Sequence, residues 1–315
     1  MEEGKETKEK LMKTKRQRIS RRDREEERDR LSELPDCVLL HIMRFMKTKC
    51  AVQTCILSKR WKDLWKRLTV LSFYPWEFRR VINLNKFVSK VLSGRDGSIS
   101  LLNLCIWAHS RTTSKLLNRV MKYAMLHDVQ TIEIYFSFRN IPNFFDPLIF
   151  SCQSLTSLKL YNSGSLLEFP KSLQLPALKN LFLEKVTFNT RDNGCAEPFS
   201  TCNLLNSLGL SECSLHNDAN ALFISNSNLS SLKLRDTFQN KIVLSTPNLS
   251  SLTIVQYLGF NCQPISSTCN LSCLEEGTIQ TTANISYSVV IGWLQVLTNL
   301  KILTLSYDTL MIMLR

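Results

Sequence analysis

The sequence predicts an α/β protein: a small N-terminal helical unit followed by a curved solenoid with a parallel β-sheet on its concave face. Two observations predict this fold. From Leu31 to Leu68 the apolar residues recur at helical spacing, and from residue 129 onward a six-residue leucine pattern recurs almost to the C-terminus. With 315 residues, 44% of them hydrophobic, the chain can bury a large core.

The first 30 residues form a charged leader with 12 Lys/Arg and 9 Asp/Glu. Almost no large apolar side chain interrupts it, so we expect residues 1–28 to be a disordered tail. The segment KTKRQRISRR (13–22) could serve as a nuclear-import signal or be simply solvated. Eleven cysteines without a CxxC pair, and no apolar leader, indicate reduced thiols in the nucleus and/or cytoplasm.

Helical signals begin at Leu34-Pro35-Asp36, where proline suits the first turn of a helix. Apolar residues then follow at three-to-four spacing over 38–46, and a second stripe runs over 52–68. A unit of this size cannot bury all of that apolar surface by itself. Part of the surface is therefore expected to dock on another protein.

Leu-x-x-Leu-x-Leu, or the same pattern with Ile, marks the repeats. Successive copies start 20 to 29 residues apart, a spacing typical of leucine-rich repeats. The alternative, a set of leucine-rich helices, fits poorly because five prolines and many Ser/Asn residues interrupt the region. The copies are VQTIEI from Val129, LTSLKL from Leu155, LKNLFL from Leu178, LNSLGL from Leu205, LSSLKL from Leu229, LSSLTI from Leu249, LSCLEE from Leu271, which keeps half the pattern, and LKILTL from Leu300.

In each repeat the last two apolar positions are expected to point inward from a short strand, while the first covers the turn before it. The positions that alternate with them face the concave side and are candidates for binding a substrate. Aromatic residues dominate interface hot spots, which favours Tyr161 and Phe182. The candidate substrate-binding residues are Tyr135, Lys159, Tyr161, Phe182, Lys233 and Arg235.

The segment LSELPDCVLLHIMRFMKTKCAVQTCILSKRWKDLW resembles the F-box motif, in the form found in plant F-box proteins with leucine-rich repeats. Leu-Pro-Asp, an aliphatic helix, Thr-Lys, Ala-Val, Leu-Ser-Lys-Arg-Trp and Leu-Trp occur in the order and spacing of that family. The domains expected are the tail (1–28), the F-box (29–70), a linker with the first irregular strand-helix units (71–127) and the leucine-rich repeats (128–315). Within the linker, residues 78–92 and 112–126 are expected to form amphipathic helices that flank a strand at about 101–107.

The resemblance implies a substrate-recognition adaptor of an SCF-type (cullin-RING) E3 ubiquitin ligase. The F-box would dock on a Skp-family linker protein, which attaches to a cullin, while the repeats hold an unidentified protein substrate. It further implies that Trp61 meets the linker, whereas Trp65 packs toward the repeats. The residues implied to face the linker are Leu34, Pro35, Ile42, Leu57 and Trp61.

Two departures from the family pattern accompany this resemblance. Met46-Lys47 stands where the family usually has Leu-Pro, which implies a looser turn there. Many relatives also carry a further C-terminal domain, whereas this chain stops at Arg315, as a short family member or a truncated gene product would. The alternative function is therefore a repeat scaffold that does not engage the ligase.

The sequence shows no enzyme motif: its glycines form no phosphate-binding loop, and no His pairs with Cys or an acid at a convincing spacing. We therefore expect a non-catalytic protein with no cofactor and no metal. No membrane partner is expected, since no stretch approaches 20 apolar residues. The net charge of +13 raises a third possible function besides the adaptor and the scaffold, which is nucleic-acid binding through the basic tail and Trp61/Trp65. We consider it the least favoured of the three.

Overall fold

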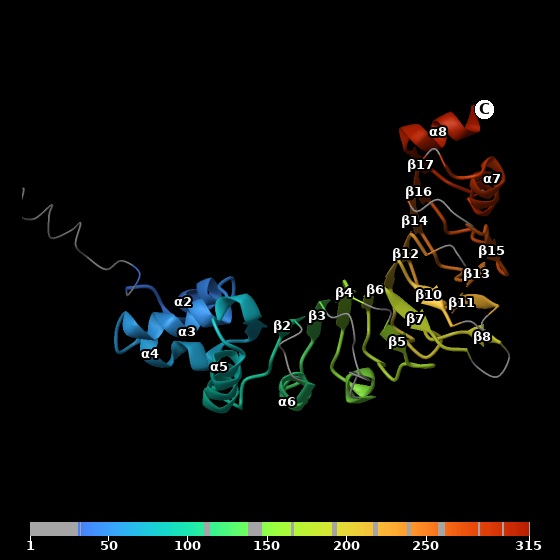
Figure 1. Ribbon diagram of the computed structural model, residues 1–315. Coiled ribbons are helices and arrows are strands. Elements are labelled where there is room, and N and C mark those ends of the chain that lie inside the picture. Colours follow the sequence, from blue (N-terminus) through green and yellow to red (C-terminus); the bar gives the residue numbers. More distant parts are fainter. Residues whose placement is uncertain are drawn as a thin grey trace, which may run out of the picture.

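In the computed structural model the chain forms an arc, with the helical unit at one end and a solenoid curving away from it (Figure 1). A long sheet lines the inner side of the arc, and helices and short strands cover the outer side. The structure describes residues 31–314, except for 32, 110–113, 138–146, 165–166, 191–193, 217–219, 238–240, 258–261, 283 and 298. The charged tail and its possible import signal thus lie outside the described residues.

The helical unit is built from short helices around a small apolar core. Leu39, Met43, Ala51, Trp61 and Leu64 are buried in it. The elements are α2 (Asp36–Met43), α3 (Thr48–Gln53), the 3₁₀ turn η1 (Thr54–Ile56), α4 (Trp61–Leu64) and the 3₁₀ turn η2 (Trp65–Arg67).

An ion pair joins the two ends of this unit. The Arg60 guanidinium lies 2.6 Å from the Asp36 carboxylate and also donates to the Leu34 carbonyl. Arg67 lies 3.7 Å from the same carboxylate. The Leu-Pro-Asp entry and the Ser-Lys-Arg-Trp segment are therefore one structural pair, and Arg60 already has an anionic partner within the protein.

The inner sheet is ten-stranded, and each strand pairs in parallel with the corresponding strand of the next repeat. Parallel strands need a crossover between them, which each repeat supplies on the outer side. In spatial order the strands are β1 (Val70–Phe73), β2 (Asn103–His109), β3 (Thr131–Ser137), β4 (Ser157–Asn162), β6 (Asn180–Glu184), β9 (Ser207–Ser211), β12 (Ser231–Arg235), β14 (Ser251–Gln256), β16 (Glu276–Thr281) and β17 (Ile302–Leu305).

The outer side changes character along the arc. The first crossovers carry η3 (Pro75–Glu77), α5 (Val81–Gly94), α6 (Ser114–Leu126) and η4 (Pro147–Ser151), and the last carries α7 (Tyr287–Val296). Helix α8 (Tyr307–Met313) follows the last strand. Between them lie two small parallel sheets: β5 (Leu167–Phe169), β7 (Val186–Phe188) and β10 (Ser214–Leu215), then β8 (Cys195–Ala196), β11 (Ala221–Ser225), β13 (Lys241–Ser245) and β15 (Ile265–Ser267).

Burial follows the repeat pattern. In the copy from Leu155 all three patterned leucines are fully buried, and Val129, Ile132 and Ile134 are buried in the same way. The Asn-Leu-Ser triplets have a structural reason: the amides of Asn228 and Asn248 donate to backbone carbonyls of the preceding repeat, at 2.6 and 2.7 Å. These side chains link successive coils, as the stacking of repeats requires.

One repeat differs from its predicted register. The copy read from Leu271 actually begins at Leu274, because Glu276 and Gly277 pair with Ser251 and Leu252 of the preceding strand. A glycine thus occupies a position that leucine usually fills. The side chain of Leu300, from the next repeat, takes that space, since a Cβ on Gly277 would lie 2.6 Å from its Cδ1. The missing leucine explains why only half of the pattern was visible in the sequence.

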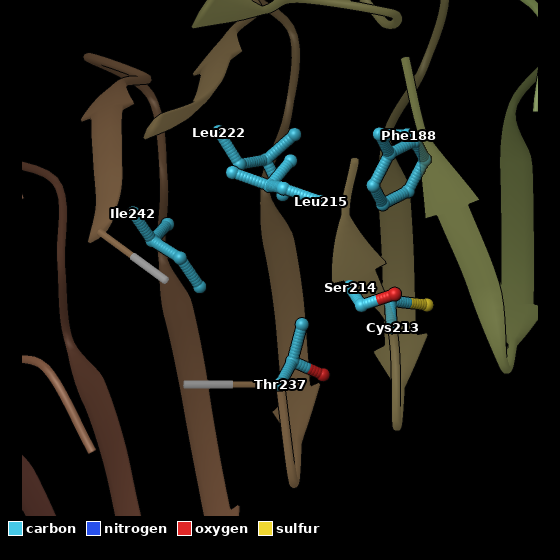
Figure 2. A pocket seen from close by; sticks show the side chains of 7 residues that line it. All are labelled: Phe188, Cys213, Ser214, Leu215, Leu222, Thr237 and Ile242. Carbon is cyan, nitrogen blue, oxygen red and sulfur yellow. The ribbon is translucent and has the colours of Figure 1, made fainter. Parts of the chain in front are cut away.

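Between the inner and outer strands the core is tightly packed. Figure 2 shows a small cavity there, lined by Phe188, Cys213, Thr237 and their neighbours. Its volume of about 10 Å³ could hold at most a single water molecule and is too small for a ligand. The Cys213 thiol lies 3.5 Å from the Leu183 carbonyl oxygen and 3.4 Å from that of Ser211, and donates its hydrogen within this core.

Candidate protein-interaction sites

The helical unit exposes several large apolar side chains. Ile42 and Val38 lie one turn apart on α2 and are 37% and 38% exposed. Beyond η1, Leu57 is 60% exposed, and Ile56 beside it is 84% exposed. Pro35 is exposed and Leu34 half-buried. Exposed aliphatic residues of this size on adjacent short helices are suited to docking on another protein.

The two tryptophans of this unit differ in burial: Trp61 is buried and Trp65 is half-buried. Trp61 was expected to meet the linker protein, but only 4% of it is exposed, because its indole fills the core of the small helical unit. Trp65 agrees with its expectation: it packs so closely on Gly94, at the end of α5, that a Cβ there would lie 2.8 Å from its Cη2. The buried Trp61 ring is therefore not free to stack on a nucleic-acid base.

A buried arginine joins the helical unit to the solenoid. Arg95 is 5% exposed and follows α5. Its guanidinium donates to the Leu68 carbonyl at 2.7 Å, the Ser100 carbonyl at 2.9 Å and the Tyr123 hydroxyl at 3.2 Å. These partners belong to the end of the helical unit, the loop before β2 and helix α6, so one side chain fixes three segments.

On the concave face, side chains of successive strands form a ladder of stacked aromatic rings. Tyr135 and Tyr161 are register partners, with ring centroids 4.4 Å apart and planes 5° apart. Trp107 stacks on Tyr135 at 4.2 Å and 6°, and Phe182 contacts Tyr161 at 5.0 Å. Trp76, from η3, meets Trp107 edge-on at 4.8 Å. We call these five residues the aromatic ladder.

Stacking restricts how the ladder can bind. The faces of Tyr135 are covered by its neighbours on both sides, so a partner meets mainly ring edges and hydroxyl groups. Burial of its phenol raises the pKa of Tyr135, which therefore stays a neutral hydrogen-bonding group at physiological pH. The ladder is thus a firm, amphipathic strip running across the strands.

The predicted basic residues occupy different surroundings. Lys159 is paired with Glu133 on the neighbouring strand at 2.7 Å, and this hydrogen bond raises the pKa of the lysine. Arg235 lies 3.7 Å from the Asp236 carboxylate and 5.9 Å from the centre of the Tyr257 ring. Lys233 is exposed between Gly209 and Thr253. The candidates are therefore not one cluster: four lie at or beside the ladder, and Lys233 and Arg235 lie further along the sheet.

Sequence reasoning missed four residues at these sites: Trp76, Val38 and Ile56, which are exposed, and Trp107, which is half-buried. Trp107 lies on a predicted strand and alternates with buried residues, a signal that could have identified it. Trp76 follows a strand, β1, that was not expected. Val38 and Ile56 neighbour predicted docking residues, but their spacing alone does not show which flank of a short helix is exposed.

No group of three or more His, Cys, Asp or Glu side chains is arranged to hold a metal ion in the part that the structure describes. All eleven cysteines are free thiols. Burial raises the pKa of Cys105 and of Cys202 to about 11, which keeps both neutral and unreactive at physiological pH. The described helices include none long and apolar enough to cross a membrane.

A small helical unit joined to a solenoid of leucine-rich repeats defines a class of repeat protein, and comparison with known families agrees. The F-box domain matches residues 31–73. A second family, described as "FBD-associated F-box protein At5g56370, LRR repeats", matches residues 117–306, more than half of the chain. The chain therefore belongs to the F-box proteins with leucine-rich repeats, as its sequence motifs indicated.

Individual relatives come from Arabidopsis thaliana. FBD-associated F-box protein At4g10400 is 30% identical over 72% of this chain and 56% of its own length. The putative F-box/LRR-repeat protein At4g15060 is 29% identical over 74% of this chain and 56% of its own. The chain spans about half the length of the curated relatives it matches. No solved structure matches it significantly.

Proposed function

We propose that this chain is a substrate-recognition adaptor of an SCF-type ubiquitin ligase. F-box proteins with leucine-rich repeats are generally such adaptors, and the F-box match is the observation that carries the proposal. In this proposal the exposed apolar residues of α2 and η1 dock on a Skp-family linker, which attaches to a cullin. The concave sheet holds the protein substrate, and the protein itself performs no chemistry.

Co-purification with a Skp-type protein tests the first half. Replacing Ile42 and Leu57 by Asp places charges on the proposed docking surface without touching the core, and should abolish the complex. Ile82→Asp is the control, because Ile82 is about as exposed as Leu57 but lies on α5 of the solenoid. Unchanged linker binding by the Ile42/Leu57 variant would refute the docking surface.

The alternative is a repeat scaffold that no longer engages a ligase. Met46-Lys47 motivates it, since these residues replace the Leu-Pro usual in the family. Pull-down of a substrate together with the linker and a cullin supports the adaptor role, whereas a substrate without either supports the scaffold.

We also propose that the protein acts in the nucleus and/or cytoplasm. Its free thiols are compatible with a reducing compartment. A fluorescent fusion, with and without residues 13–22, would reveal both the compartment and any role of the basic leader.

A further inference from the structure

A hollow of about 250 Å³ lies where the helical unit meets the concave sheet. One wall is the turn after α2, including Arg44, Met46 and Lys47. The floor belongs to the first three strands and includes Ser72 and Cys105. Pockets for drug-sized ligands usually measure about 300–1,000 Å³, so this hollow suits a single side chain better than a cofactor.

Strand register explains why the surface is hollow there. Ser72, Cys105 and Glu133 form one row across β1, β2 and β3, and short side chains fill much of this row. The next row toward the strand ends carries Trp107 and Tyr135 of the aromatic ladder. Small residues thus lie directly beside large rings, and the turn of the helical unit closes the opposite side.

The rim of the hollow carries excess positive charge. Glu133, its acidic residue, is already neutralised by Lys159 at 2.7 Å. Lys47 lies 3.9 Å from Glu77, a loose pair, and its ammonium is 5.2 Å from the centre of the Tyr74 ring. Arg44 is exposed and takes part in no ion pair found among the described residues. An incoming carboxylate would therefore meet one unpaired and one weakly paired cation.

We propose that this hollow is a subsite of the substrate-binding surface and takes an acidic side chain of the substrate peptide. Arg44 and Lys47 hold the carboxylate, and the aromatic ladder packs against the residues that follow it. The inference rests on the proposed function, in which the concave face binds a protein. It gives the F-box a second role, since its turn then forms part of the substrate receptor. It also assigns a role to Lys47, which departs from the family pattern: binding the carboxylate of the substrate.

Peptide selection on the full chain tests the subsite without a known substrate. A displayed library of random-sequence peptides should yield binders enriched in Asp and Glu. In R44E/K47E these binders should lose about tenfold or more in affinity, and a fresh selection should favour Lys and Arg. K86E/K90E is the matched control, with the same charge change on exposed positions of α5, and should keep the acidic preference.

Two outcomes would overturn the subsite: no acidic enrichment on the native chain, or equal binding of the selected peptides to R44E/K47E. If that variant fails to fold, R44Q/K47Q replaces it, and should weaken acidic peptides without creating a basic preference. Co-purification with a Skp-type protein, measured on the same samples, tests the ligase role separately. If the chain selects acidic peptides but does not bind the Skp-type protein, the subsite is supported and the adaptor role is refuted.

Discussion

Leu57 and Trp61 begin and end the Leu-Ser-Lys-Arg-Trp segment but have opposite surroundings. Trp61 is 4% exposed, whereas Leu57 is 60% exposed. Trp61→Ala removes a buried indole and should lower the free energy of unfolding by about 3–5 kcal/mol. Leu57→Ala should leave that free energy almost unchanged and weaken linker binding instead. Chemical denaturation and a linker-binding titration on both variants measure the two effects. A stable Trp61→Ala protein with reduced linker binding would restore the expectation drawn from the family.

The end of the aromatic ladder depends on a glycine. A Cβ at Gly209 would lie 2.7 Å from Cδ2 of Phe182, so Gly209→Ala should push this ring out of contact with Tyr161. Phe182 is only half-buried and can swing into solvent, which limits the cost to about 1 kcal/mol. The near-ultraviolet circular dichroism should fall while the unfolding temperature changes little. Gly97→Ala is a suitable control, because a Cβ there meets only ordinary contacts.

Cys213 should make the protein sensitive to alkaline pH. Burial raises the pKa of its thiol from the ordinary value of 9.0 to about 12. The folded protein then keeps a proton that the unfolded chain loses above pH 9, so the free energy of unfolding falls between pH 9 and about 12. The slope from this group approaches about 1.4 kcal/mol per pH unit. In Cys213→Ala the free energy of unfolding should fall less steeply over that range. Replacing the exposed Cys273 by Ala should leave the slope unchanged.

At the residue scale, the sequence predicted which concave positions alternate with the core, but not how they meet. Tyr135, Tyr161 and Phe182 are where the repeat pattern placed them. That their rings stack depends on strand register, which one sequence does not fix. Trp61 was assigned to the linker from the family resemblance, and its burial differs from that expectation. The helical stripe identified it as an apolar residue of the small unit, but a stripe does not show which of its members face inward.

At the element scale, Arg95 connects the helical unit to the solenoid. Arg95→Met should remove three hydrogen bonds and leave the Leu68 and Ser100 carbonyls without this partner. We expect a loss of about 3 kcal/mol or more in the free energy of unfolding. Arg95→Lys should recover only part of it, since an ammonium lacks the planar fork that reaches three partners. Denaturation measurements should show no comparable loss for Arg79→Met, where the arginine is exposed.

Elements were predictable in proportion to their regularity. The strands with two patterned leucines and the helices near 78–92 and 112–126 follow strong periodic signals, and both helices exist as α5 and α6. The outer strands were not expected, because runs of two to five residues such as β8 and β11 carry too little pattern. The repeat at Gly277 was read three residues too early because a glycine there takes the place of leucine.

For the whole molecule, the helical unit also closes the first edge of the solenoid. Thr48, at the start of α3, and Ser72 of β1 exchange two hydrogen bonds: each hydroxyl oxygen accepts from the other residue's backbone N–H, at 3.1 and 2.7 Å. Further along, the Asp96 N–H donates to the Lys66 carbonyl at 2.8 Å. Solenoid ends need such caps, since a terminal repeat has no neighbour on one side. The same contacts join the helical unit directly to the first edge of the sheet.

If the helical unit is this cap, loosening it should open only the adjoining end of the sheet. The double variant Thr48→Val with Ser72→Ala removes both hydroxyls from a buried pair. Amide hydrogen exchange in the full chain should then accelerate about tenfold or more over α3 and β1, with smaller changes at β2 and none at β14. This gradient is expected because each repeat is stabilised mainly by its immediate neighbours. Equal acceleration along all ten strands would show instead that the solenoid unfolds as one unit and that its first edge needs no separate cap.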